Sequence, residues 1–170
     1  MPHDNIVLIG MPGAGKSTLG VVLAKILNYQ FMDGDILIQS QCDKTLQKIL
    51  DACGPEGFIE VENNVLKSIQ AHQSVISPGG SAVYSDEAMK HLSDIGTIVY
   101  LQISYDQLIS RLSDLRERGV VMKDGIGMSL RDLYDERKPL YEHYADITVD
   151  VSDLSITAAA RKVADALEQH

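Results

Sequence analysis

The sequence is poor in cysteine, in positive charge and in long apolar runs. Cys42 and Cys53 are its only cysteines, and neither lies in a C-x-x-C or Cys/His spacing, which argues against a disulfide framework or a cysteine-based metal site. No apolar run approaches the roughly 20 residues that a membrane-spanning helix needs. The 24 Asp and Glu residues outnumber the 15 Lys and Arg residues, so the net charge is −9, and no basic stripe offers contacts to phosphate backbones. We therefore expect neither a nucleic acid nor a membrane as a partner.

The start of the chain also lacks the pattern of a secretory signal. No basic segment followed by an apolar stretch precedes the apolar run that begins at Ile6. Two cysteines outside any pairing framework suit a reducing compartment. The 170 residues match the length of one domain and contain no repeat or linker. We expect a cytoplasmic monomer in which residues 1–170 form a single domain.

A phosphate-binding motif lies close to the N-terminus. Residues 10–18 read Gly-Met-Pro-Gly-Ala-Gly-Lys-Ser-Thr, and their first eight positions fit the pattern G-x-x-x-x-G-K-[ST]. An apolar run at 6–9 precedes the motif, and residues 18–27 follow it with the apolar spacing of one helix face. A strand, a glycine loop and a helix are the context that this motif requires.

This context predicts which residues bind a nucleotide. Lys16 can reach the β- and γ-phosphates, and the hydroxyl of Ser17 can bind Mg²⁺, with Thr18 the less favoured ligand. The glycines free the loop backbone to point its N–H groups at phosphate oxygens. The predicted nucleotide-binding residues are Gly10, Gly13, Ala14, Gly15, Lys16, Ser17 and Thr18.

Strand and helix patterns alternate along the rest of the chain, which predicts an α/β sandwich of three layers around a parallel sheet. Strands are expected at 6–9, 29–32, 74–77, 97–102 and 147–151. Helices are expected at 18–27, 36–41, 45–52, 55–70, 86–92, 104–115 and 129–144, and from 155 onward.

Polar residues follow three of the expected strands, and ligands of such sheets bind beyond the carboxyl ends of the strands. The phosphate loop follows the first strand, Asp33 and Asp35 the second, and Gly79 and Gly80 the third. Either aspartate could orient the waters of a metal or accept a proton from an acceptor hydroxyl; a plain Asp-Gly turn is the alternative. A second glycine segment permits close backbone approach to a substrate.

Residues 116–128 are polar and glycine-rich, and we interpret them as a mobile lid. Arg116 and Arg118 are placed to swing over the phosphates, where arginine stabilises developing charge; a solvated surface loop is the alternative. Arg137 lies on the following, heavily charged helix, where a solvent-facing side chain is the alternative.

Taken in order, these motifs resemble those of the shikimate kinases, within the wider group of P-loop kinases. The resemblance covers nearly the whole chain and rests on residues 10–18, Phe-Met-Asp-Gly-Asp at 31–35, Phe58 and Glu62, Pro-Gly-Gly at 78–80, an arginine-bearing lid, Arg137-Lys-Pro-Leu-Tyr at 137–141 and Ala-Asp at 145–146. Members of that family have a five-stranded parallel sheet and move a phosphoryl group from ATP to a ring hydroxyl.

The resemblance implies roles for individual residues. Asp33 would serve the Mg²⁺ shell, and Asp35 would hold the acceptor's hydroxyls and polarise the attacking one. The glycines of 78–80 would offer backbone N–H groups to the substrate. Arg118 would be the lid arginine at the nucleotide, and Arg137 would bind the substrate carboxylate.

Three positions depart from the family pattern, all on or near the acceptor side. Ile59 stands where the family has a second arginine for the carboxylate, although Glu62, which would steady that arginine, is present. Ser81 replaces the third glycine of a Gly-Gly-Gly segment, and the lid has Gly119 where the family has proline. The loss of a charge-assisted contact at position 59 would cost about 1.5–3 kcal/mol or more.

The sequence leaves several functions open. The first is an ATP-dependent kinase of shikimate that holds the carboxylate with Arg137 or with help from a lid arginine. The second is a kinase of another acceptor, such as a small hydroxy acid, a sugar acid or a hydroxy-amino acid. Homoserine is an example of the last, because Glu62 beside Ile59 could suit its ammonium group. A nucleotide-binding module without acceptor chemistry and a nucleoside monophosphate kinase are weaker alternatives.

Overall fold

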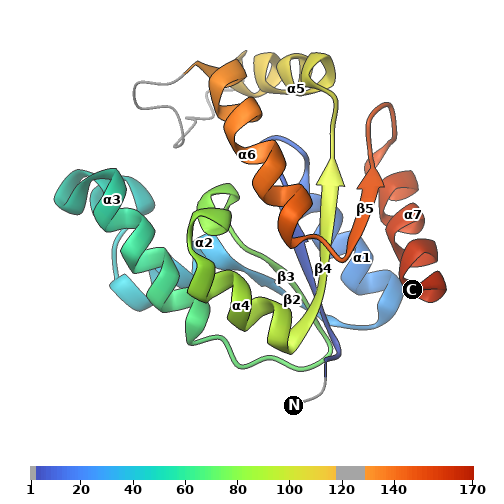
Figure 1. Ribbon diagram of the computed structural model, residues 1–170, viewed down its shortest axis with the longest axis horizontal. Helices are drawn as coiled ribbons and strands as arrows, with labels where there is room; N and C mark the ends of the chain where they lie inside the picture. The colour runs from blue at the N-terminus through green and yellow to red at the C-terminus, as the bar shows by residue number, and fades with distance from the viewer. Residues whose placement is uncertain (1–2, 118–128) are drawn as a thin grey trace.

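The computed structural model describes residues 3–117 and 129–170, and a parallel sheet of five strands forms its middle layer (Figure 1). The strands are β1 (Asn5–Ile9), β2 (Gln30–Asp33), β3 (Ser74–Ser77), β4 (Gly96–Gln102) and β5 (Ile147–Asp150). They lie in the order β2-β3-β1-β4-β5, and each neighbouring pair is parallel. The predicted five-stranded parallel sheet is confirmed, with strands close to the expected positions.

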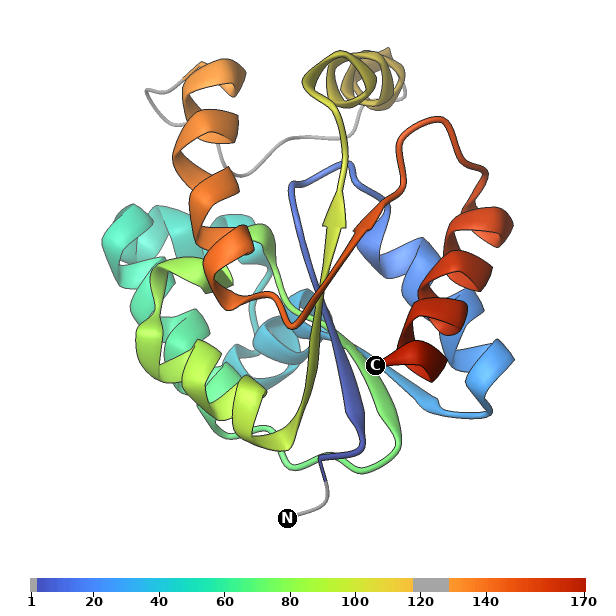
Figure 2. The same cartoon turned by 45° about the vertical axis from the view of Figure 1, so that its right-hand side comes forward.

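Helices cover both faces of this sheet, as predicted. The helices are α1 (Lys16–Leu27), α2 (Gly34–Cys42), α3 (Leu46–Lys67), α4 (Asp86–Ile95), α5 (Tyr105–Glu117), α6 (Leu130–Tyr144) and α7 (Ile156–Gln169), with a short 3₁₀ turn, η1 (Gly80–Tyr84). Figure 2 shows α1 and α7 on one side of the sheet and α3, α4 and α6 on the other. None of the helices in the described ranges is long and apolar enough to cross a membrane.

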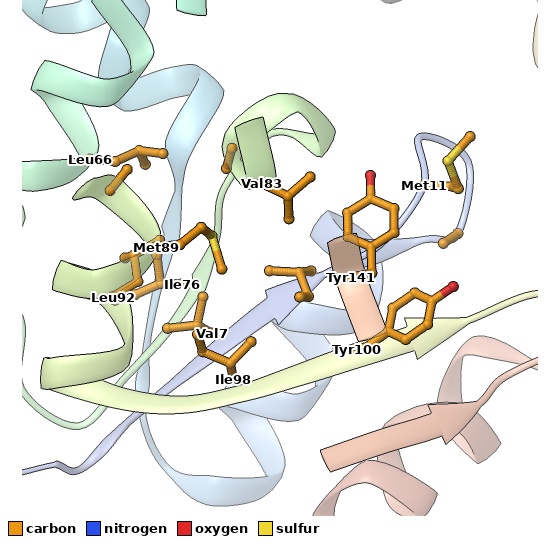
Figure 3. Close-up of a cluster of buried hydrophobic side chains, with 14 of the residues drawn as sticks. Val7, Met11, Leu66, Ile76, Val83, Met89, Leu92, Ile98, Tyr100 and Tyr141 are labelled. Carbon is orange, nitrogen blue, oxygen red and sulfur yellow. The ribbon is translucent and has the colours of Figure 1, made fainter. Parts of the chain in front are cut away.

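The two faces follow from the alternation of side chains along buried strands. Val7 and Ile9 of β1 point to the face covered by α3, α4 and α6, where Figure 3 shows Val7 packed among apolar side chains. Ile6 and Leu8 point the other way, into a second cluster with α1 and α7. Every residue of β1 is buried because both faces are covered.

The structure differs from the predicted elements in two places. Residues 45–52 and 55–70 were expected as separate helices, and α3 joins both across a break at Gly54, whose φ of 70° and ψ of 177° are not helical. Pro55 then opens the second part, since proline suits a first helical turn. The glycine segment after β3 continues into η1, which was not predicted from the sequence. Of the predicted lid, residues 118–128 lie outside the described ranges, Arg118 among them.

Asn5 ties together the amino ends of three neighbouring strands. Its Nδ2 donates hydrogen bonds to the carbonyl oxygens of Ala71 at 2.9 Å and Ile95 at 2.8 Å, and its Oδ1 accepts one from the N–H of Ser74 at 3.1 Å. The side chain is fully buried. It therefore satisfies backbone groups that flank β3 and β4 and that water cannot reach.

We predict that Asn5→Ala lowers the free energy of unfolding by about 2–4 kcal/mol, because each buried polar group left unpaired costs about 1–3 kcal/mol. Urea denaturation measures this change. Asn64→Ala, at an exposed position of α3, is the matched control and should change stability by less than about 1 kcal/mol. Equal urea midpoints for both variants would show that Asn5 does not hold the strands.

Candidate active site

The phosphate loop joins β1 to α1 and ends in the cap of that helix. Gly15 is the N-cap residue and has a φ of 90°, a conformation that favours glycine. Ala14 is buried, and its N–H donates to the carbonyl oxygen of Met11 at 3.0 Å, which closes the loop. The first N–H groups of α1 and the positive end of its dipole therefore face the loop, an arrangement that suits the binding of phosphates.

Lys16 lies on this loop as the sequence motif predicts. Its Nζ donates to the carbonyl oxygens of Gly10 at 2.8 Å and Met11 at 3.0 Å. These contacts hold the ammonium group over the loop. The side chain is largely buried, and the two carbonyl oxygens serve as its hydrogen-bond acceptors. The position suits a cation that neutralises phosphate charge.

The two predicted metal ligands also lie together. The hydroxyl of Ser17 donates to Oδ2 of Asp33 at 3.0 Å. The other carboxylate oxygen of Asp33 accepts from the N–H groups of Asp35 at 2.9 Å and Ile36 at 3.2 Å and so caps α2. Asp33 is thus oriented by the backbone while one oxygen faces Ser17, a pair of oxygen donors of the kind that Mg²⁺ prefers.

A cavity lies between α2, α3 and η1, and Pro12 of the phosphate loop lies against its wall at Gly80. It is lined by Asp35, Leu46, Gln47, Leu50, Phe58, Glu62, Gly79, Gly80 and Ser81. Three predicted substrate-binding residues, Asp35, Gly79 and Gly80, are therefore among its walls. A Cβ on Gly79 would lie 2.7 Å from Oε2 of Glu62 and 3.2 Å from Oδ1 of Asp35, so two carboxylates border the same glycine.

Arg137 reaches this region from α6 and is buried, with an exposed fraction of 3%. Its Nη1 lies 2.8 Å from the position that a Cβ on Gly80 would take. The alternative of a solvent-facing Arg137 is therefore wrong. The structure brings the arginine predicted to bind a carboxylate against the glycine segment that borders the cavity.

Glu62 has a partner that the sequence did not suggest. Its exposed fraction is 1%, and its Oε1 accepts a hydrogen bond from the hydroxyl of buried Ser81 at 2.6 Å. As far as the described residues define it, the cavity lining includes Phe58 and Glu62 but not Ile59. Ser81, one departure from the family pattern, thus contacts Glu62, the residue that the resemblance pairs with an arginine at position 59.

Tyr141 is a residue whose role only the structure reveals. Its hydroxyl donates to the carbonyl oxygen of Gly80 at 2.8 Å, and its ring stacks on that of Tyr100 at 5.2 Å between centroids. Figure 3 shows both tyrosines on the right-hand side of the apolar cluster. Tyr141 therefore fixes, from α6, the backbone of the glycine segment that borders the cavity.

Arg111 of α5 is a second residue that the motif analysis missed. Its Nη1 donates to the carbonyl oxygen of Ala14 at 3.1 Å and its Nη2 to that of Val151 at 3.4 Å. Leu108 and Leu112, on the same helix face, pack near Gly13. The sequence did contain a signal for Arg111. Positions i, i+3 and i+4 share a helix face, so Arg111 is a cation on the same face as the apolar residues Leu108 and Leu112.

The parallel sheet, the phosphate loop after its central strand and the adjoining carboxylate-bearing cavity define a P-loop kinase of a small molecule. Comparison with known proteins agrees. The family model "Shikimate kinase" matches residues 12–168. A shikimate kinase of Vibrio cholerae serotype O1 is 35% identical over 98% of this chain and 96% of its own length. One from Francisella tularensis subsp. holarctica is 36% identical over 94% of this chain and 92% of its own length.

Solved structures give the same result. The shikimate kinase from Acinetobacter baumannii in complex with shikimate superimposes with a TM-score of 0.84 at 29% identity, covering 98% of this chain and 93% of that one. A gluconokinase from Sinorhizobium meliloti 1021, at 16% identity and a TM-score of 0.61, shares the fold alone. The chain belongs to the shikimate kinase family. It is accordingly an ATP-using phosphotransferase with an alcohol group as acceptor.

We predict that Lys16→Ala abolishes turnover while the fold persists. Removal of a preorganised charge from a phosphoryl-transfer site costs about 10²–10³-fold in kcat or more. A coupled ADP-release assay measures the loss, and circular dichroism checks the fold. Lys25→Ala, at an exposed position of the same helix, should leave turnover intact. Near-normal turnover of Lys16→Ala would contradict the assignment of the phosphate loop.

Proposed function

We propose that this protein transfers the γ-phosphoryl group of ATP to a ring hydroxyl of shikimate. The main support is the placement of Arg137, Asp35 and the Gly79–Gly80 segment around one site beside the phosphate loop. Such a site offers a cation for a carboxylate and a carboxylate for hydroxyl groups. The similar structure from Acinetobacter baumannii is itself a complex with shikimate, which supports the same acceptor here.

On the donor side, Lys16 and the N–H groups of the loop bind the phosphates, with contributions from Gly10, Gly13, Gly15 and Thr18. Ser17 and Asp33 fit Mg²⁺, because both present oxygen atoms and lie 3.0 Å apart. Among the described residues there is no group of three or more acidic, histidine or cysteine side chains that could hold a metal. A site of one or two protein oxygens completed by phosphates and water is the kind that Mg²⁺ occupies with nucleotides.

On the acceptor side, Asp35 holds the reacting hydroxyl and accepts its proton as the new P–O bond forms and the bond to ADP breaks. Arg137 binds the carboxylate, which sets the ring so that the hydroxyl faces the γ-phosphate. Arg118 is proposed as the lid arginine that stabilises charge on the transferred group.

With ATP as donor, we place the reaction in the cytoplasm. The free cysteines agree with a reducing compartment. We expect the protein to be a monomer.

Homoserine is less well supported as an acceptor than the sequence suggested. That idea depended on a glutamate available for an ammonium group, and Oε1 of Glu62 already accepts the hydroxyl of Ser81. Gluconate and other sugar acids retain a carboxylate for Arg137. These acceptors therefore belong in the test of the proposal.

We expect ADP release to depend on shikimate and to be at least about tenfold slower with homoserine or a sugar acid, because a site built for one set of polar groups rejects ligands that leave them unpaired. A coupled spectrophotometric assay with each acceptor at equal concentration measures this. Mass spectrometry should show addition of one phosphoryl group to shikimate. Turnover with another acceptor but not with shikimate would refute the proposal.

Positions 59 and 81 allow a second prediction. Ile59→Arg should lower the KM for shikimate by about tenfold, since a charge-assisted contact contributes about 1.5–3 kcal/mol and part is lost in ordering the new side chain. Adding Ser81→Gly should lower the KM further, because Oε1 of Glu62 then no longer accepts the hydroxyl of Ser81 and can accept from the new arginine. Steady-state kinetics of both single variants and the double variant measure the coupling.

Ile26→Arg, an exposed apolar-to-arginine change on α1, is the matched control and should leave the KM unchanged. A KM that stays the same or rises in Ile59→Arg would show that residue 59 cannot direct an arginine to the acceptor carboxylate.

A further inference from the structure

Tyr84 stands at the end of η1, directly against the arginine that we assign to the acceptor. Its hydroxyl accepts a hydrogen bond from Nε of Arg137 at 3.2 Å. Its ring also lies beneath the guanidinium group, with 5.2 Å between Cζ of Arg137 and the ring centroid. Tyr84 thus contacts Arg137 both through its hydroxyl and through its aromatic face.

The hydroxyl of Tyr84 has a second partner on α6. It donates to Oε2 of Glu136 at 2.9 Å, and Glu136 is the residue just before Arg137. Burial raises the pKa of Tyr84 above its usual value, against the opposing effect of Arg137, so the hydroxyl stays protonated at neutral pH. A protonated hydroxyl is what this arrangement needs, because it accepts from one neighbour and donates to the next.

These contacts locate two nitrogen atoms of the Arg137 guanidinium. The bond to Tyr84 uses the Nε–H, while Nη1 lies against Gly80 at the wall of the cavity. Arginine has a long side chain with several rotamers, and binding is weaker when a ligand must first order it. A partner at Nε and a ring below leave the guanidinium few orientations.

We propose that Tyr84 is a positioning residue for acceptor recognition, which orients the Arg137 guanidinium toward the substrate carboxylate before the substrate binds. This inference rests on the proposed function. The orientation of Arg137 matters more here than in a site with a second arginine at position 59. Ile59 has no charge, so the contact with the carboxylate depends on how Arg137 is oriented.

The test is Tyr84→Phe, which keeps the ring and removes the hydroxyl. With shikimate we expect the KM to rise about tenfold, while kcat and the KM for ATP change less than twofold. With methyl shikimate, whose carboxylate is masked, kcat/KM should change less than twofold. A similar loss with both acceptors, or no change with shikimate, would overturn the proposal.

Tyr144→Phe is the matched control, because Tyr144 also lies on this side of the sheet and its hydroxyl contacts a carboxylate, that of Asp86. It should leave both acceptors unaffected. Thermal unfolding of the two variants separates a general loss of stability from an effect on Arg137.

A measurement without substrate separates this inference from the proposed function. In the ¹⁵N NMR spectrum of the free protein, the Nε–H of Arg137 should give a sharp, slowly exchanging signal that broadens in Tyr84→Phe but not in Tyr144→Phe. If the wild type shows this signal but does not turn over shikimate, the proposed function fails and the positioning by Tyr84 stands. A fast-exchanging wild-type signal would overturn the positioning itself.

Discussion

Parallel pairing places the carboxyl ends of β1, β2 and β3 at a common edge, and every part of the site depends on this. The phosphate loop leaves β1, Asp33 ends β2, and the Pro-Gly-Gly segment follows β3. Because β3 lies between β1 and β2, the phosphate loop and the Pro-Gly-Gly segment occupy adjacent positions. Antiparallel pairing of any of these strands would send its loop to the opposite edge.

The acceptor cavity imposes a second constraint, since it buries charged groups. A buried charge is tolerated only with hydrogen-bonding partners, and η1 supplies partners for two of them. Ser81 donates to Glu62 of α3, and Tyr84 accepts from Arg137 of α6. Tyr141 in turn holds the carbonyl of Gly80. A turn of five residues thus connects the two helices that bring opposite charges to the site.

Sequence reasoning predicted the sheet well, because its signals are local. Short apolar runs and alternating helices indicate a parallel sheet, and the glycine-lysine motif marks the nucleotide loop without knowledge of distant contacts. The burial of Arg137 was not predictable in this way: its helix carries many charges, and only the packing of α6 on the sheet shows which face is covered. The Tyr84 and Ser81 contacts depend on η1, whose hydrogen bonds join residues 53 and 19 positions apart.

The departures at positions 59 and 81 are best understood together. Glu62 is deeply buried, and a buried carboxylate is stabilised by each hydrogen-bond donor that reaches it. A glycine at 81 offers no side-chain donor, whereas serine adds a hydroxyl at 2.6 Å from Oε1. The serine therefore adds one uncharged donor to Oε1 of Glu62. Asp35 and Glu62 place two carboxylates in the cavity wall, and Arg137 lies against its Gly80. In the function that we propose, recognition of an anionic acceptor therefore depends on the direction of the hydrogen bonds from Arg137.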